Sequence, residues 1–281
     1  MAHPPIRHTG DGNLEYRELG GTGVMVPEIG LGTWKYKGGP EPLRKGIDLG
    51  ANLIDTAEMY RTEDSVGAAI KNRRDKVFLA TKVLGSNLRR DAVLQAAENS
   101  LRLLEDDVID LYQIHWSNRS VPISETMGAM EELVDRGMVR YIGVSNFSVA
   151  EMKEAQRAMT KNPLVSNQVL YNLKRREIER DLIPYCADNG ITVIAYTPLA
   201  DGSLAGRSRL LPDKRGAVLE QVSQEVGKTP AQVALNWCLS RPNMIVIPKT
   251  NSVERTIENC EASGWSLSAD QVAMLDEAFP T

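Results

Sequence analysis

Cysteine and histidine are scarce in this chain of 281 residues, and both shortages limit what it can be. The three cysteines are widely separated along the chain: Cys186, Cys238 and Cys260. They form no CxxC spacing, so neither a disulfide framework nor a zinc site is indicated, and we expect reduced, buried thiols. Of the three histidines, only His115 lies outside the N-terminal stretch, so the sequence predicts no metal site.

Long apolar runs and basic tracts are also missing. No run approaches the roughly 18 apolar residues that cross a bilayer, and the N-terminus lacks the apolar stretch of a secretion signal. A net charge of −4 without a basic tract disfavours nucleic-acid binding. We therefore expect a cytoplasmic protein with no membrane or nucleic-acid partner. No heptad or interface stripe is visible, which leaves the oligomeric state open and is compatible with a monomer.

What the sequence does contain is a repeated pattern of short apolar runs. Residues 14–29 are expected to form a hairpin that turns at Gly20-Gly21-Thr22-Gly23. Eight apolar runs follow, at residues 29–31, 52–54, 77–81, 108–114, 139–144, 164–168, 191–196 and 244–247. Amphipathic segments separate them, and several begin with helix-capping residues: Asp91, Ser148 with Glu151, and Thr229 with Pro230.

Eight strands that alternate with helices predict a parallel sheet covered on both faces. An open, doubly wound sheet usually carries G-x-G-x-x-G after its first strand, whereas residues 30–34 read Gly-Leu-Gly-Thr-Trp. We therefore predict a (β/α)₈ TIM barrel formed by residues 1–281 as one domain, with an N-terminal β-hairpin and extra C-terminal helices. Residues 1–12 are expected to be a flexible tail. The longest irregular segment, 197–212, has a length typical of functional loops.

Four polar side chains stand at or just after the ends of neighbouring predicted strands: Asp55, Tyr60, Lys82 and His115. Active sites of parallel barrels lie at the carboxyl ends of the strands. Each residue alone has an ordinary interpretation, such as a helix cap, a solvated lysine or a packed core histidine. Their shared position favours a site.

These four side chains suit the transfer of a proton from a phenol. A phenol ordinarily titrates near 10, and a neighbouring ammonium lowers its pKa by favouring the phenolate. A carboxylate would keep the lysine charged, and a histidine could donate a hydrogen bond to a developing alkoxide. Reduction of a carbonyl also requires a hydride, which no side chain supplies, so a cofactor is required.

With these residues the chain resembles the aldo-keto reductase family over nearly its whole length. Residues 50–67 are similar to the first signature of that family, with Gly50, Asp55-Thr56-Ala57, Glu63 and Val66-Gly67 in place. The resemblance implies that Asp55, Tyr60, Lys82 and His115 are the catalytic tetrad, with Tyr60 as the proton donor. It also implies that Trp34 and Trp116 join Tyr60 and His115 in binding a small carbonyl substrate.

The same resemblance implies a site for NADPH/NADP⁺. Ser145 and Asn146, in the run Gly143 to Phe147, and Gln168 would hold the nicotinamide carboxamide, and Tyr196 would stack on the ring. Residues 197–204 would close over the pyrophosphate. At the other end Lys249, Thr250 and Arg255 would hold the 2′-phosphate, and Glu258 and Asn259 the adenine. The remaining expected cofactor contacts are Thr33, Asp55, Pro198, Leu199 and Asn251.

The segment 247–259 has a physical interpretation of its own. A strand is expected to end at Ile247 and a helix to begin near Ser252, and the N–H groups of a helix N-terminus favour an anion. Lys249 and Arg255 add two positive charges, which favours NADP(H) over NAD(H), although a solvated basic pair is the plainer alternative.

The implied function is reversible, NADPH-dependent reduction of aldehydes or ketones. Two other functions remain open at this stage: a non-catalytic NADP(H)-binding regulatory subunit, and a Schiff-base enzyme that uses Lys82 as the nucleophile. Arg61 stands where a small or neutral residue is more usual, so it could either bind an acidic substrate or face solvent. The chain ends soon after its last predicted helix, residues 270–278, from which we expect an open substrate pocket.

Overall fold

The computed structural model describes residues 14–206 and 214–281. Its main sheet has eight parallel strands, and each pairs with the next one along the chain. The strands are β3 (Leu31–Gly32), β4 (Leu53–Asp55), β5 (Phe78–Val83), β6 (Ile109–Ile114), β7 (Val139–Ser145), β8 (Leu164–Leu170), β9 (Thr192–Tyr196) and β10 (Met244–Val246). The expected tail at 1–12 and residues 207–212 of the expected long loop lie outside the described residues.

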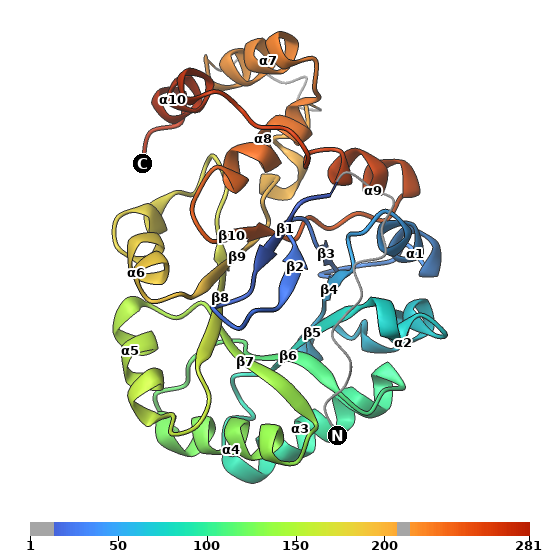
Figure 1. The fold of residues 1–281 in the computed structure, drawn as a ribbon, viewed down its shortest axis with the longest axis vertical. Helices are drawn as coiled ribbons and strands as arrows, with labels where there is room; N and C mark the ends of the chain where they lie inside the picture. Colours follow the sequence, from blue (N-terminus) through green and yellow to red (C-terminus); the bar gives the residue numbers. More distant parts are fainter. Residues whose placement is uncertain (1–13, 207–213) are drawn as a thin grey trace.

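The sheet closes into a barrel because the residues just before its first strand, β3, pair with its last strand, β10. Ile29 forms a parallel bridge with Val246. The N–H of Gly30 donates to the carbonyl of Val246 over 2.8 Å, and the N–H of Val246 donates to the carbonyl of Glu28 over 2.9 Å. The predicted (β/α)₈ barrel is therefore confirmed, and Figure 1 shows the helices arranged around it.

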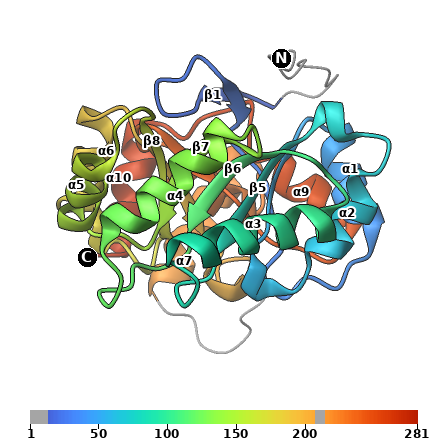
Figure 2. The ribbon, with the colours of Figure 1, turned by 90° about the horizontal axis from the view of Figure 1, so that it is seen from below.

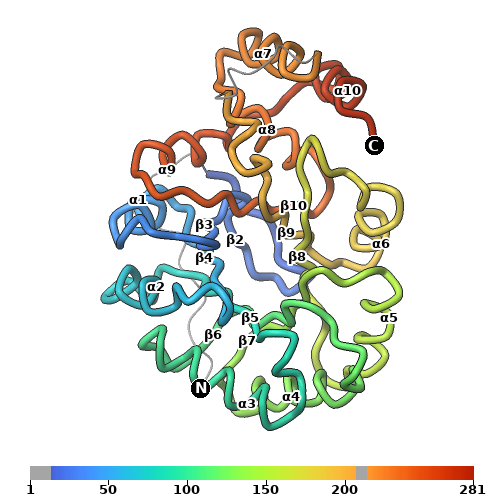
Figure 3. The backbone as a smooth tube through the Cα atoms, turned by 180° about the vertical axis from the view of Figure 1, so that it is seen from behind, coloured from blue at the N-terminus to red at the C-terminus, as the bar shows by residue number. Residues whose placement is uncertain are grey.

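Ten α-helices lie in the described part of the chain. They are α1 (Pro40–Asp48), α2 (Glu63–Ile70), α3 (Arg90–Leu104), α4 (Ile123–Asp135), α5 (Val149–Ala158), α6 (Leu182–Asp188), α7 (Lys214–Val226), α8 (Pro230–Leu239), α9 (Val253–Cys260) and α10 (Ala269–Ala278). Helices α7 and α10 lie side by side beyond α8, outside the ring (Figures 1 and 3). Of these two extra helices, only α10 follows the last strand. None of the ten is long and apolar enough to cross a membrane.

The N-terminal hairpin covers one end of the barrel (Figure 2). Its strands, β1 (Tyr16–Glu18) and β2 (Met25–Pro27), are antiparallel, as predicted. Leu19 and Val26 are fully buried in one cluster with apolar side chains of the barrel. Gly20 has a φ of +54°, and a Cβ there would lie 2.4 Å from the carbonyl oxygen of Val165, so glycine alone fits this contact. The hairpin leaves the carboxyl ends of the strands open.

Of the three capping predictions made at Asp91, Ser148 and Thr229, two are correct and one is wrong. Ser148 and Thr229 both form capping boxes, with Glu151 and Gln232 respectively. Asp91 does not cap α3, which begins one residue earlier, at Arg90. The physical reason is that Glu125 of α4 accepts a hydrogen bond from the N–H of Arg90, so a neighbouring helix satisfies the end that a local cap would otherwise serve.

Candidate active site

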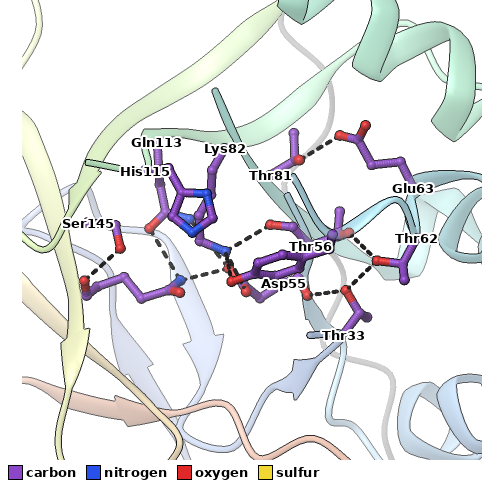
Figure 4. A network of polar contacts seen from close by, with 12 residues as sticks. Thr33, Asp55, Thr56, Thr62, Glu63, Thr81, Lys82, Gln113, His115 and Ser145 are labelled. Carbon is purple, nitrogen blue, oxygen red and sulfur yellow. Dashed lines mark hydrogen bonds and ion pairs between the residues drawn. The ribbon is translucent and has the colours of Figure 1, made fainter. Parts of the chain in front are cut away.

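The four predicted side chains meet at the carboxyl end of the barrel, and Figure 4 labels three of them, Asp55, Lys82 and His115. Asp55 is the last residue of β4, Lys82 is the second-last residue of β5, and His115 follows β6 directly. Tyr60 ends the short 3₁₀ helix η1 (Glu58–Tyr60), which follows β4. Because neighbouring parallel strands end at the same side of the sheet, these residues are brought together although 60 positions separate Asp55 from His115 in the chain.

Lys82 is the centre of the group. Its side chain is fully buried, and Nζ donates to Asp55 Oδ2 over 2.7 Å, to the carbonyl of Thr56 over 2.8 Å and to the Tyr60 hydroxyl over 3.4 Å. An ammonium has three N–H groups, so all three have acceptors. Burial alone would lower the pKa of Lys82, but Asp55 and Tyr60 outweigh it and the net pKa is raised. Lys82 is therefore held as an ammonium.

The pKa of Tyr60 is raised above its ordinary value of 10.0. Burial is the largest cause; Lys82 lowers the pKa and Asp55 raises it. From the sequence, the ammonium alone predicts a lowered pKa for Tyr60, but in the structure the effect of burial is larger. Lys82 thus reduces the cost of forming the phenolate without making Tyr60 a stronger acid than a free phenol.

The second carboxylate oxygen of Asp55 is held by two amides. Gln168 Nε2 donates to Oδ1 over 2.7 Å, and Gln113 Nε2 over a weaker 3.4 Å. Asp55 therefore uses one oxygen for Lys82 and the other for glutamine side chains from β6 and β8. This arrangement fixes the rotation of the carboxylate and aims Oδ2 at the ammonium.

His115 is a buried, neutral imidazole. Burial, together with the charge of Lys82, lowers its pKa from 6.5 to about 3. The ring stacks on Trp116 with 3.7 Å between ring centroids, and it meets Tyr60 edge to face at 5.5 Å. Its Nδ1 atom is buried and has no hydrogen-bond partner among residues 14–206 and 214–281. The imidazole also lines the cavity described below, beside Tyr60.

A second polar group lies beside the tetrad, at the ends of β7, β8 and β9. Ser145 Oγ donates to the carbonyl of Gln168 over 2.9 Å, Asn146 Nδ2 donates to the carbonyl of His115 over 3.1 Å, and the Tyr196 hydroxyl donates to Asn146 Oδ1 over 2.9 Å. Gln168 Oε1 is buried without a partner in the described part of the chain. A buried, unpaired acceptor of this kind fits the N–H of a ligand amide.

Both groups open into one cavity of about 850 Å³. Most of the predicted site residues line it: Thr33, Trp34, Asp55, Tyr60, His115, Trp116, Ser145, Asn146, Gln168, Tyr196, Pro198, Leu199, Lys249, Thr250, Arg255, Glu258 and Asn259. Trp34 lies beside Tyr60 and Trp116 beside His115, at what we call the outer end of the cavity. Their side chains are 43% and 40% exposed. Lys82 lies just behind the lining, in contact with Asp55 and Tyr60. The volume of the cavity, and a lining that reaches from the tetrad to Arg255 and Asn259, suit a dinucleotide better than a small metabolite alone.

The far end of the cavity is built for an anion. Helix α9 begins there, and Ser252 accepts a hydrogen bond from the N–H of Arg255 as its N-cap, as the sequence predicts. Lys249 and Arg255 line the cavity at this helix start. The pKa of Lys249 is lowered by burial and by the charges of Lys37 and Lys35, so several positive charges gather here. A phosphate would relieve that repulsion.

Asn251 is the predicted cofactor residue that does not line the cavity. Its Oδ1 accepts a hydrogen bond from the N–H of Lys37 over 2.9 Å, which ties the loop after β10 to the loop after β3. Arg61 is exposed and is not part of the cavity lining either. Between binding an acidic substrate and facing solvent, the structure therefore favours an Arg61 side chain that faces solvent.

Several polar residues of the site were not predicted from the sequence. Gln113 offered a signal, because it is a polar residue inside the apolar strand β6. Thr62 offered none, since a threonine before a helix is commonly an ordinary cap. Lys35 lines the cavity, and its ammonium lies 5.5 Å from the ring of Trp34.

The family of the chain is shown by comparison with known proteins. A profile of the Aldo/keto reductase family matches residues 28–279, so the chain belongs to this family of oxidoreductases. Methylglyoxal reductase YeaE of Escherichia coli (strain K12) is 40% identical over 269 residues, which cover 92% of each chain. The glyoxal reductase of Bacillus subtilis (strain 168) is 34% identical over 260 residues, covering 90% of this chain and 89% of its own.

Solved structures give the same family. The thermostable aldo-keto reductase Tm1743, solved with the inhibitor epalrestat, is 40% identical and superposes with a TM-score of 0.87 over 94% of this chain and 100% of its own. An aldo/keto reductase from Klebsiella pneumoniae, solved with NADP and acetate, is 39% identical with a TM-score of 0.81, over 92% of this chain and 93% of its own.

The low pKa of His115 predicts a loss of stability in mild acid. The unfolded chain takes up a proton near pH 6.5, whereas the folded protein resists it until about pH 3, so stability is lost as the pH falls between these values. Urea unfolding of the wild type at pH 7 and pH 5 should show a loss about 2 kcal/mol larger than that of His115→Gln. Equal losses in the two proteins would contradict the neutral, buried imidazole.

Proposed function

We propose that this protein reduces aldehydes or ketones to alcohols with NADPH, reversibly, and that Tyr60 donates the proton. One observation carries the proposal: the contact chain Asp55–Lys82–Tyr60 opens on a cavity that also reaches Lys249 and Arg255. A proton donor and an anion site thus share one cavity. Membership of an oxidoreductase family supports the same reaction.

NADPH, when bound, supplies the hydride that the chain's own side chains lack. Ser145, Asn146 and Gln168 would hold its carboxamide, with the unpaired Gln168 Oε1 as an acceptor for the amide N–H. Tyr196 would face the nicotinamide ring. At the helix α9 end, Lys249, Thr250 and Arg255 would hold the 2′-phosphate, and Glu258 and Asn259 the adenine. The Klebsiella relative solved with NADP supports this cofactor.

The chain's own residues manage the proton. When the carbonyl is reduced, negative charge would develop on its oxygen, and Tyr60 would give its proton to that oxygen and become a phenolate. The ammonium of Lys82, 3.4 Å from the phenol oxygen, stabilises the negative charge left on Tyr60. Asp55 keeps Lys82 protonated through the step. Because His115 is neutral, it assists through a hydrogen bond to the carbonyl oxygen rather than by donating a second proton.

The outer end of the cavity supports a broad choice of carbonyl substrate. Trp34 and Trp116 provide apolar walls that are still partly open to solvent. Within the described residues, none after Asn259 lines the cavity, so residues 260–281 add no cover to it. The named activities of the relatives make methylglyoxal and glyoxal the first substrates to test.

A Schiff-base mechanism is disfavoured by the state of Lys82. An amine nucleophile needs a lowered pKa, whereas the pKa of Lys82 is raised and its three N–H groups are all engaged. A non-catalytic subunit would need the anion site and the cavity but not this arrangement of Lys82 and Tyr60. Neither alternative accounts for the contact between the ammonium and the phenol.

Replacing Tyr60 with Phe tests the proton donor. The change removes one oxygen and keeps the ring, so NADPH should bind with nearly unchanged affinity while turnover of methylglyoxal falls by roughly 10²–10⁴-fold. Steady-state rates and a titration of NADPH fluorescence measure the two quantities. A Tyr60→Phe enzyme with wild-type turnover would remove Tyr60 from the mechanism.

Replacing Arg255 with Ala tests the choice of cofactor. Loss of a charged contact to the 2′-phosphate should weaken NADPH binding by about 1–3 kcal/mol and leave NADH binding nearly unchanged. Arg180→Ala is the matched control, because its side chain is 84% exposed, pairs with the neighbouring Asp181 and does not line the cavity. Equal losses for NADPH and NADH in Arg255→Ala would contradict the assigned phosphate site.

A further inference from the structure

Three threonine hydroxyls form a hydrogen-bonded series beside the tetrad, which we call the threonine series (Figure 4). Thr33 follows β3, Thr56 follows β4, and Thr62 immediately precedes α2, so the threonine series joins three segments of the barrel rim. Their Oγ1 atoms lie 3.1 Å apart for Thr33 and Thr62, and 3.0 Å apart for Thr56 and Thr62. All three side chains are buried. Thr62 is the middle member.

The direction of the threonine series follows from the number of protons. Thr33 Oγ1 donates its only proton to the carbonyl of Asp55 over 2.9 Å, so in its contact with Thr62 it must accept. Thr62 therefore donates its own hydroxyl proton to Thr33, and Thr56 must donate to Thr62. The result is a continuous series, Thr56 to Thr62 to Thr33 to the carbonyl of Asp55. Hydrogen bonds in such a series strengthen one another.

Both ends of the series lie next to acceptors of Lys82. Asp55 provides the carboxylate, and Thr56 provides the carbonyl that accepts from Nζ over 2.8 Å. The segment between Thr56 and Thr62 carries Tyr60. The series therefore ties the two ends of the Tyr60 loop together and joins them to the residues that hold Lys82.

Thr62 gives up an ordinary role to do this. It is the N-cap residue of α2, yet its hydroxyl accepts no hydrogen bond from the helix N–H groups. A threonine in that position usually provides this bond, which stabilises a helix by about 1 kcal/mol. Thr62 also does not line the cavity, so it touches no ligand there.

We infer that Thr62 is a positioning residue: its hydroxyl closes the loop that carries Tyr60 and so sets the distance between the phenol and the ammonium of Lys82. The inference rests on the proposed function, in which that contact governs proton transfer. Thr33 lines the cavity and Thr56 contacts Lys82 through its own carbonyl, which leaves Thr62 as the member whose effect on the reaction can only be indirect.

The test compares Thr62→Val, which keeps the shape and removes the hydroxyl, with Thr62→Ser, which keeps the hydroxyl. Thr62→Val should lower kcat for methylglyoxal about tenfold and change the KM for NADPH by less than about twofold. Thr62→Ser should restore kcat to within about threefold of the wild type. The matched control is Thr126→Val, because Thr126 is a buried threonine of α4 whose hydroxyl donates to the carbonyl of Leu88, away from the cavity.

A structural role alone would lower the melting temperature of Thr62→Val and Thr126→Val alike and leave both kcat values unchanged; that result would overturn the inference. So would a Thr62→Ser enzyme as slow as Thr62→Val. The expected result is a loss of kcat confined to Thr62→Val.

A second readout does not depend on turnover. The phenolate absorbance of Tyr60, obtained by subtracting the titration of the matching protein that carries Tyr60→Phe, should appear at higher pH in Thr62→Val. The reason is that the phenol moves away from Lys82, while Asp55, Tyr196 and the neutral His115, which also face it, remain in place. An unchanged titration would overturn the inference. If the wild type reduces no carbonyl, the proposed function fails, and this titration alone decides the role of Thr62.

Discussion

The buried ion pair between Lys82 and Asp55 is the interaction on which the site depends. Removing two charges from water costs several kcal/mol per ion, and their attraction repays this only when the remaining hydrogen-bonding groups are also satisfied. Here the carbonyl of Thr56 and the hydroxyl of Tyr60 accept the two remaining N–H groups of the ammonium. Gln168 and Gln113 donate to the second oxygen of the carboxylate. The polar residues around the tetrad are the condition under which this pair can be buried.

The barrel explains how so few residues can be arranged so closely. Lys82 on β5 is in register with Gln113 on β6, and Asp55 ends the strand on the other side of β5. Each of these side chains stands on a strand whose neighbours are fixed by hydrogen bonds, so their separations vary little. Tyr60 is the exception, because it stands on the short 3₁₀ helix η1 after β4 and not on a strand. Its position has to be set by contacts such as those of the threonine series.

Much of this was predictable from the sequence. Eight apolar runs separated by amphipathic segments predicted the barrel, and the position of Asp55, Lys82 and His115 at the strand ends predicted where they meet. Those inferences rest on periodicity and on the common direction of parallel strands, which are properties of short segments. The helix start at Ser252 and the capping boxes of Ser148 and Thr229 are local in the same sense.

The remaining features depend on contacts between distant segments. Asp91 fails as a cap because Glu125, from another helix, reaches Arg90. Asn251 turns from the cavity because the loop after β3 offers it the N–H of Lys37. The net rise in the pKa of Tyr60 depends on how deeply the phenol is buried, which no spacing in the sequence encodes.

The central claim is that the Lys82 ammonium makes the Tyr60 proton available. It is tested most directly by the pH dependence of kcat/KM for carbonyl reduction in the wild type and in Lys82→Met, with NADPH binding measured in both to confirm an intact site. In the wild type the rate should fall at high pH as Tyr60 loses its proton. In Lys82→Met the rate should be lower by roughly 10²-fold or more, and the high-pH fall should shift upward because the phenolate has lost its stabilising charge. A variant that binds NADPH and keeps the wild-type rate and pH profile would contradict this account.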